Sequence, residues 1–348
     1  MDEASTPDLS IIIVSWNVRD LLRACLNSLT KDERRKTKDV AEASSFVLTA
    51  PANTAGGCRC RPSFEIVVID NASADGSAAM VAAEFPAVRL IANIENVGFT
   101  RGNNQGLAVA RGRQVFFLNP DTEVVGDALA EMVAYLDAHP EVGALGPELR
   151  YGDGSLQSSR RRFPTLTTAL FESTPLAWHW PANPWARRYR MEDQGSGVRG
   201  QGSGGKGQEV DWVIGAALMV RREVLAQIGG FDEGYFMYSE ELDLCRRIKE
   251  AGWRIVYLPT AQVIHHEGKS SEQVVTARHI RFQTSKVRYF RKFHGRLAAG
   301  ALRAFLLAAF AVEWSLEAIK WLLNSKRPLR RERMAAYAQL LASGLRPS

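Results

Sequence analysis

The feature that most constrains the fold of this chain is a series of short apolar runs, separated by helix-like segments, in its first third. The runs are typical of buried strands and comprise residues 10–15, 65–70, 88–92 and 114–118. The segments between them have apolar residues at helical spacing, or a turn that leads into a helix, and comprise residues 20–29, 71–85 and 102–110. Strands that alternate with helices predict a parallel, doubly wound sheet.

Polar side chains stand where three of these strands end. They are Ser15, Asn17, Asp70, Asn71, Asn119 and Asp121. Ligands of doubly wound sheets bind beyond the carboxyl ends of the strands, so these residues are candidates for a binding site. The Asp121 carboxylate is suited to a divalent metal that bridges two phosphates of a ligand. The alternative is an ordinary strand-end turn, in which Asn, Pro and Asp are common.

The second half of the chain continues the alternation of strands and helices. Its predicted elements are strands over residues 210–220 and 254–258 and a helix over 240–251, which follows a turn at 229–232. This helix begins with Glu240, Glu241 and Asp243, and acids at a helix start usually do no more than complement the helix dipole. The alternative is that one carboxylate is a general base that deprotonates an acceptor hydroxyl.

Two further motifs contain side chains suited to ligands. His265 and His266 follow the strand over 254–258 in a predicted loop, where an imidazole can bind a metal or serve only in packing. The segment 96–104 contains glycines that allow close backbone approach, and its Arg101 offers a planar guanidinium to a phosphate or a base. The alternative for this segment is a helix-capping loop.

Two segments interrupt the pattern and are predicted as loop insertions. Residues 31–61 separate a helix from a strand by far more than the usual ~2–6 residues. Residues 190–209 include a glycine-rich stretch of low complexity. Both lie outside the motifs, so they affect the shape of loops rather than the chemistry of the site.

The last part of the chain, residues 276–348, predicts a basic, amphipathic helical tail. Its wholly apolar run, residues 304–312, is far shorter than the ~20 residues that span a bilayer. Glu313, Glu317 and Lys320 form a polar stripe along the same helix. We therefore expect the helix to lie in the interface of an anionic membrane.

The apolar face of this helix is the part expected to enter the membrane. It carries Leu306, Leu307, Phe310 and Trp314. The alternative is that this face packs onto the catalytic domain or onto a second subunit, which would make the helices an oligomer interface.

The cysteines and the start of the chain indicate the compartment. The four cysteines are Cys25, Cys58, Cys60 and Cys245, and they lack a usual zinc spacing. The first residues have no basic region followed by an apolar one, as a signal peptide would. We expect a reduced, cytoplasmic protein that is peripheral on the inner face of the membrane.

The motifs gain specificity from their order along the chain. They read SIIIVSWN, EIVVIDNASADGS, NVGFTRGNNQG, VFFLNPD, DWVIGAALMVRR, GGFDEGYFMYSEELDLCRRI and VIHHEGKSS. This series resembles glycosyltransferase family 2, particularly its rhamnosyltransferase-like and galactofuranosyltransferase-like members, over residues 10–271. The resemblance implies a GT-A fold, an α/β architecture with a Rossmann-like, mostly parallel sheet flanked by helices. A nucleotide-sugar half would span 1–125, an acceptor half 126–275, and a helical C-terminal extension would follow.

The resemblance also implies a role for each matching residue. The catalytic base would be Glu241, supported by Glu240, Asp243, Arg246 and Asp232. Donor binding would involve Ser15, Asn17, Asp70, Asn71, Arg101, Asn119 and Asp121, and the sugar and acceptor would contact Trp212 and Gly215. The metal ligands would be Asp121 and His265, or His266 in its place.

The implied reaction is an inverting transfer of a sugar from a nucleotide-sugar donor to a hydroxyl acceptor, with Mn²⁺ or Mg²⁺ as the divalent cation. Rhamnose is the first expectation for the sugar, and the acceptor is expected to be a saccharide or a lipid-linked precursor of a cell wall or polysaccharide. No nucleic-acid partner is expected. The alternatives are a nucleotidyltransferase on a similar fold and a catalytically inactive scaffold relative.

Overall fold

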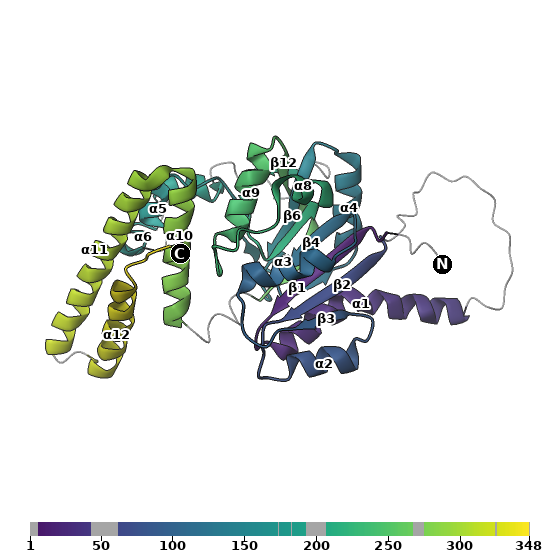
Figure 1. Cartoon of the computed structure of the whole chain (residues 1–348), viewed down its shortest axis with the longest axis horizontal. Coiled ribbons are helices and arrows are strands. Elements are labelled where there is room, and N and C mark those ends of the chain that lie inside the picture. Colours follow the sequence, from purple (N-terminus) through teal and green to yellow (C-terminus); the bar gives the residue numbers. More distant parts are fainter. Residues whose placement is uncertain are drawn as a thin grey trace.

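The computed structural model describes residues 6–42, 62–172, 174–181, 183–192, 207–266, 275–323 and 326–347, with the backbone alone over 31–42. The helices and strands form an α/β core, and three long C-terminal helices stand beside it (Figure 1). Most of the two predicted insertions, residues 43–61 and 193–206, lies outside the described residues.

The first third of the chain has the predicted strand–helix alternation. Its elements are β1 (Leu9–Ser15), α1 (Arg19–Glu42), β2 (Phe64–Asp70), α2 (Ser77–Glu84), β3 (Arg89–Ala92), α3 (Phe99–Val109) and β4 (Gln114–Leu118). The four strands are parallel and lie in the order β3-β2-β1-β4. The expected interruption at residue 31 is wrong at its start, because helix α1 continues to Glu42.

The second half of the chain extends the same sheet and makes it mixed. Its elements are β5 (Thr122–Val125), α4 (Ala128–Ala138), β6 (Val142–Arg150), β7 (Leu156–Gln157), β8 (Arg160–Arg161), α5 (Leu166–Phe171), α6 (Pro175–His179), α7 (Pro184–Tyr189), β9 (Gln208–Val210), β10 (Trp212–Val213), β11 (Ala217–Arg221), α8 (Arg222–Ile228), α9 (Glu240–Glu250) and β12 (Arg254–His265). The sheet continues from β4 as β11-β6-β12-β5. Strand β11 is antiparallel to both of its neighbours, whereas β6 and β12 are parallel.

The predicted strand over 210–220 is in fact broken into three. Val210 ends β9, which pairs with β12, while β10 leaves the main sheet and pairs with β8. Strand β11 then begins at Ala217 and returns to the main sheet beside β4. Residues 214–216 therefore form an irregular segment next to the carboxyl end of β4, where Asn119 N–H donates to the Ala216 carbonyl at 2.9 Å.

Helices cover both faces of the sheet, which explains the unbroken apolar runs of its central strands. Along β1, Ile12 and Val14 belong to one core cluster. Ile11 and Ile13 point to the other face and pack with α1, α2 and α4. Since successive side chains of a strand alternate between its faces, a strand that is covered on both sides is apolar at every position.

The C-terminal tail is helical, as predicted. It forms α10 (Val275–Phe293), α11 (Gly295–Leu322) and α12 (Arg327–Ser343), which pack against one another. Helices α10 and α11 are antiparallel, and the rings of His279 and Phe310 lie 5.1 Å apart. Because α11 has 28 residues and α10 has 19, the end of α11 extends past the start of α10 by ~13 Å (Figure 1).

The apolar face that was expected to enter a membrane is turned inward for the most part. Leu306 and Phe310 are fully buried and belong to the same core cluster as α9 and α10, and Leu307 packs against it. Glu317, predicted in an exposed polar stripe, is also buried. The outer face of α11 carries different apolar residues, which are Leu297, Val312, Leu316, Ile319, Leu322 and Leu323.

Candidate active site

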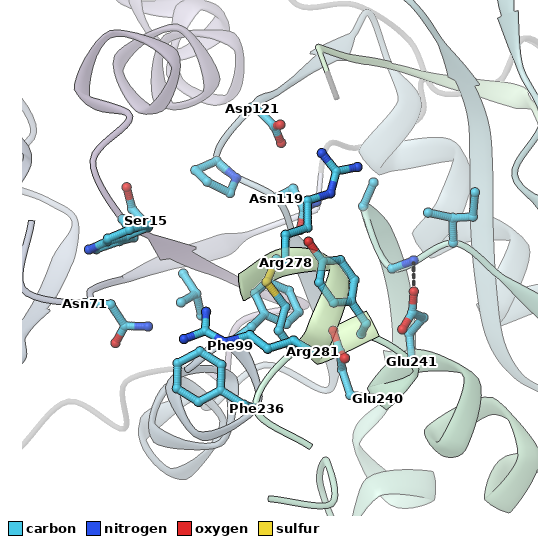
Figure 2. A pocket seen from close by; sticks show the side chains of 18 of the residues that line it. Ser15, Asn71, Phe99, Asn119, Asp121, Phe236, Glu240, Glu241, Arg278 and Arg281 are labelled. Carbon is cyan, nitrogen blue, oxygen red and sulfur yellow. Dashed lines mark hydrogen bonds between the residues drawn. The ribbon is translucent and has the colours of Figure 1, made fainter. Parts of the chain in front are cut away.

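A cavity of about 240 Å³ lies at the carboxyl ends of β1, β2 and β4. Its walls come from these strand ends, from the irregular segment 214–216, from the turn before α9 and from the start of α10 (Figure 2). Five buried polar atoms of its lining have no hydrogen-bond partner, and they are Ser15 Oγ, Asn119 Oδ1, Tyr238 Oη, Glu240 Oε2 and Glu241 Oε2. Buried polar groups are rarely left unpaired without a reason, so this concentration indicates a ligand site.

Strand pairing places an acid and an imidazole together in this cavity. Strand β5 begins directly after Asp121 and pairs with the end of β12, with Thr122 opposite His265. The two side chains are buried, and His265 Nε2 lies 3.4 Å from Asp121 Oδ1. The other ring nitrogen of His265, Nδ1, is 2.9 Å from Gln157 Oε1.

His266 lies on the other side of the strand end. Its Nε2 is 2.9 Å from Glu123 Oε1, and it does not line the cavity. The sequence left open which of the two histidines would be the metal ligand. Only His265 lines the cavity. The expected loop is also wrong for His265, because β12 continues to that residue.

The polar residues after β1 and β2 divide into two groups. Ser15 and Asn71 line the cavity, and Asn71 is held by a bond from its Nδ2 to the Gly98 carbonyl at 3.1 Å. Asn17 and Asp70 do not line it. The Asp70 carboxylate accepts a hydrogen bond from the Ser73 backbone N–H, and the Asn17 amide oxygen accepts one from the Ala74 N–H. Both side chains therefore shape the loop after β2.

The start of α9 buries two neighbouring carboxyl groups in the cavity. Glu240 is 5% exposed, and its pKa is raised well above the ordinary value by burial and by the charge of Glu241. Burial also raises the pKa of Glu241. The preceding residues, Tyr238 and Ser239, have φ of 71° and 63°, a left-handed conformation that is uncommon for residues other than glycine. Such outliers are found mostly at functional sites.

Gly215 sets the distance between the irregular segment and α9. Its backbone N–H points to Glu241 Oε1 at 3.4 Å. A Cβ at position 215 would lie 3.1 Å from the Glu241 Cβ and 3.2 Å from its Cγ. A larger residue would press on the Glu241 side chain, so Gly215 favours this close approach of the two segments.

Helix α10 holds the turn that precedes α9, residues 236–239. The Arg281 guanidinium stacks over the Phe236 ring, 4.0 Å from its centroid. The Ser285 hydroxyl donates to the Met237 carbonyl at 2.8 Å. The tail is thus part of the wall of the cavity as well as of the helical bundle.

Asp232 binds α10 rather than a ligand. Its carboxylate accepts from Lys292 at 2.7 Å, from Arg288 at 3.0 Å and from the Gly234 backbone at 2.9 Å. Burial opposes its ionisation, but Lys292, Gly234 and Arg288 together outweigh this and lower its pKa to about 2.

Asp243 lies behind the cavity and is fully buried. It pairs with Arg247 and Lys292, each at 2.7 Å, and the Tyr235 hydroxyl donates to it at 3.2 Å. Lys292 therefore joins Asp232 and Asp243. These two acids fix the positions of α9 and α10, which supports the site from outside.

Three further residues predicted to act in the site do not line the cavity. Arg101 is exposed on α3 and pairs with Glu233 at 3.2 Å. Trp212 is buried, and its indole N–H donates to the Arg162 carbonyl. Arg246 lies on the outer side of α9, where it pairs with a glutamate one turn later in the helix. Helical or strand direction turns each of these side chains away.

Two charged residues of the cavity were not predicted. Arg278 and Arg281 come from the start of α10, and both project into the cavity (Figure 2). The sequence shows them as members of a basic tail, and their spacing of three residues was the one available signal that they share a helix face.

A mixed sheet with a buried acid–histidine pair and buried glutamates at its strand ends defines a GT-A glycosyltransferase. The chain belongs to glycosyl transferase family 2, whose model matches residues 10–226, and residues 185–343 match the model of glycosyl transferase family group 2. Sugar transfer from a nucleotide-sugar donor is therefore its activity. The family and the fold class confirm what the order of the motifs predicted.

Curated relatives narrow the comparison. The chain is 34% identical over 217 residues to an N-acetylglucosaminyl-diphospho-decaprenol L-rhamnosyltransferase of Mycobacterium tuberculosis, a match that covers 59% of this chain and 67% of that protein. It is 29% identical over 177 residues to the rhamnosyltransferase WbbL of Escherichia coli, with 49% of this chain and 61% of that protein covered.

A solved structure has the same fold at low sequence identity. A mannosyltransferase of Pyrobaculum calidifontis in complex with GDP-Man and Mn²⁺ aligns with a TM-score of 0.50 and 19% identity, over 98% of this chain and 87% of that one. At this identity the comparison supports the fold alone.

Proposed function

We propose that this enzyme transfers rhamnose, with inversion at the anomeric carbon, from a nucleoside-diphosphate donor to a saccharide linked to a polyprenyl diphosphate. The observation that carries the proposal is one cavity that contains both the Asp121–His265 pair and Glu241. The choice of sugar and of acceptor class follows the two rhamnosyltransferases to which the chain is similar.

The Asp121–His265 pair is suited to a divalent cation. The Gln157 oxygen accepts from His265 Nδ1–H, so a neutral His265 would present the lone pair of Nε2 to the Asp121 carboxylate, 3.4 Å away. Two lone pairs that face each other favour a cation between them. No cluster of three or more ligating side chains occurs in the described residues, so the remaining ligands would be phosphate oxygens and water. A bound Mn²⁺ or Mg²⁺ would neutralise the charge that develops on the departing diphosphate.

Glu241 is the proposed general base. Its carboxylate takes the proton of the acceptor hydroxyl while the hydroxyl oxygen bonds to the anomeric carbon, and the nucleoside diphosphate leaves from the opposite face. The raised pKa of Glu241 makes its carboxylate a stronger base, because it brings the pKa closer to the pH at which the enzyme works. Gly215 and the turn 236–239 hold this carboxylate in position, and a fixed approach geometry contributes ~7–11 kcal/mol to lowering such a barrier.

The end of the α11–α12 hairpin is the proposed membrane contact. This tip, residues 312–323 and 326–333, extends past α10. Its residues Leu322 and Leu323 are 67% and 76% exposed to solvent. Exposed cations, among them Lys326 and Arg331, surround it. Apolar side chains with flanking cations fit an anionic bilayer surface.

A peripheral contact fits this structure better than a span. By length and composition alone, α11 is apolar enough to cross a membrane, with a mean hydropathy of 1.6 over its most apolar stretch. However, Leu302, Leu306 and Phe310 are buried against protein, and Glu317 forms ion pairs with α12. We therefore place the enzyme at the cytoplasmic surface of the membrane.

The direct test is a transfer assay with the purified full-length chain. Nucleotide-sugars, dTDP-rhamnose among them, are offered with Mn²⁺ and an N-acetylglucosaminyl-diphosphoryl prenyl lipid. We expect rhamnosyl transfer with inverted anomeric configuration, detected by mass spectrometry and NMR. Preference for another sugar would refute the donor, and the absence of transfer or hydrolysis from every donor would indicate an inactive scaffold.

A further inference from the structure

Arg278 and Arg281 place two positive charges in one cavity. They lie three residues apart in the first turns of α10, and their side chains extend in different directions within the cavity (Figure 2). Like charges at this spacing repel each other and destabilise a helix. A pair of this kind therefore needs compensation from a negative group.

Asp121, Glu240 and Glu241 line the same cavity, but none of them forms an ion pair with either arginine. Three cations further along α10 are paired, Lys286 with Glu172 and both Arg288 and Lys292 with Asp232. Neither Arg278 nor Arg281 forms an ion pair in the part of the chain that the structure describes. Burial lowers the pKa of Arg281, which adds to the cost of leaving its charge uncompensated.

The geometry of Arg281 suits a phosphate. Its guanidinium plane stacks on Phe236, which fixes the orientation of the plane and leaves N–H groups at the edge as donors. A planar guanidinium with a fixed orientation can donate two parallel hydrogen bonds to one phosphate. A lysine at this position would lack both the stacking and the fork.

Two phosphate groups take part in the proposed reaction, and their positions differ. The donor diphosphate belongs with the Asp121–His265 pair. The start of α10, in contrast, lies beside the base of the tip, since His279 packs on Phe310 of α11. A lipid-linked acceptor that is held at the tip would bring its phosphates to this end of α10.

We propose that Arg278 and Arg281 bind the diphosphate of the acceptor, which joins its saccharide to the lipid. This rests on the proposed function. The two arginines are positioning residues, because they hold the acceptor by its diphosphate so that a hydroxyl of the adjoining sugar meets Glu241.

The test measures binding and does not require turnover. Full-length enzyme is saturated with dTDP and Mn²⁺ to fill the donor site, and farnesyl diphosphate is then titrated, with farnesol as the phosphate-free probe. We expect R278Q/R281Q to weaken farnesyl diphosphate binding by about 100-fold, roughly tenfold for each arginine. Farnesol binding and dTDP affinity should change by less than about twofold. Arg291→Gln, an exposed arginine of the same helix, is the matched control.

Each alternative outcome contradicts the proposal in a different way. Loss of dTDP affinity in the double variant would assign the arginines to the donor. Unchanged farnesyl diphosphate binding would show that they bind no acceptor phosphate. Arg281→Lys should bind almost as weakly as Arg281→Gln, while a change in the unfolding temperature would reveal a merely structural role. If the wild-type enzyme binds both probes but transfers no sugar, the proposed function fails while this site stands.

Discussion

The start of α9 and the tip of the α11–α12 hairpin both bury glutamate, and they treat its charge in opposite ways. Glu240 is buried beside a second acid, its Oε2 has no partner, and its pKa is raised. Glu317 is equally buried, but Arg330 contacts it at 2.7 Å and Lys320 at 3.3 Å. Burial alone would raise the pKa of Glu317, yet these two cations outweigh it and lower the pKa.

The two environments have opposite consequences for the proton affinity of a carboxyl group. A buried acid with paired cations stabilises its surroundings but is a weak base, since its proton affinity is low. A buried acid without a cation destabilises the fold at neutral pH and is a stronger base. Glu317, at the tip, is the acid with paired cations, and it holds α11 and α12 together. Glu240, in the cavity, is the acid without one.

The largest effect is expected from a substitution of the proposed base in the cavity. Glu241→Gln should lower kcat by ~10²–10⁴ while donor affinity stays nearly constant, because the amide cannot accept the proton. The measurement is steady-state kinetics together with dTDP binding. Glu250→Gln, on an exposed position of the same helix, is the control. Unchanged turnover in Glu241→Gln would remove the residue from the mechanism.

The acid–histidine pair gives the next largest effect. Asp121→Ala should weaken donor binding and activity by about 10², and excess EDTA should abolish transfer by the wild type until Mn²⁺ is restored. Glu123→Ala is the control, since Glu123 contacts His266 outside the cavity. Full activity in excess EDTA would contradict the metal assignment.

The outer surface of the tip can be tested without truncation. Removal of α11 would uncover buried residues of α10, so charged substitutions are the cleaner change. Leu322→Glu with Leu323→Glu should reduce flotation with anionic liposomes by about tenfold or more, because burial of each leucine in lipid contributes ~1.5–3 kcal/mol.

The same substitution at the other end of α11 is the control for the tip. Leu297 is 91% exposed, but it lies at the start of the helix, so Leu297→Glu should float like the wild type. If the tip variant floats normally at low salt, the tip is an interface between proteins instead.

Stability should respond in opposite directions at the two buried glutamates. Glu317→Gln should lower the free energy of unfolding by about 1–2 kcal/mol at pH 7, because it weakens the pairing of Arg330. A lowered folded pKa contributes stability above the unfolded pKa of about 4.3, and this is lost as the pH falls through the folded value. Denaturation of the variant and the wild type should therefore converge in acid.

The smallest effect has the opposite sign. Glu240→Gln should raise the free energy of unfolding by about 0.5–1 kcal/mol at neutral pH, because it removes a charge that burial disfavours. The folded pKa of Glu240 is raised, so the gain should disappear as the pH falls below about 4.3, where both states hold the proton. A less stable variant at pH 7 would mean that Glu240 has an unrecognised partner.

The strands of the first third could be predicted because each is marked by an unbroken apolar run. A strand covered on both faces is mostly apolar, and β1 and β4 show this over residues 11–14 and 115–118. The end of β12 could not be predicted in the same way. Pro259 interrupts the pattern, and the pairing with β6 shifts register between Leu258 and Gln262, so the strand continues past the point where the sequence pattern ends.

The candidate site could be predicted only in part from the sequence. Asp121 and Glu241 stand at element ends, where polar residues after apolar runs are visible in the sequence. Arg278 and Arg281 depend on how the tail folds back onto the turn before α9, a long-range contact without a local pattern. The break at Gly215 was hidden for a related reason, since apolar residues flank it on both sides.

Helix α10 belongs both to the wall of the cavity and to the C-terminal helical bundle, and this limits where the chain can be joined to that of a related enzyme. An exchange of tails between related enzymes at residue 276 would carry Arg278, Arg281 and Lys292 with it and would replace part of the cavity wall. An exchange after Phe293 would keep that wall but would place a foreign α11 against the buried face of α10. On the two proposals made above, an exchange that changes membrane attachment would also change how the acceptor is held, so a chimera would have to be redesigned for both.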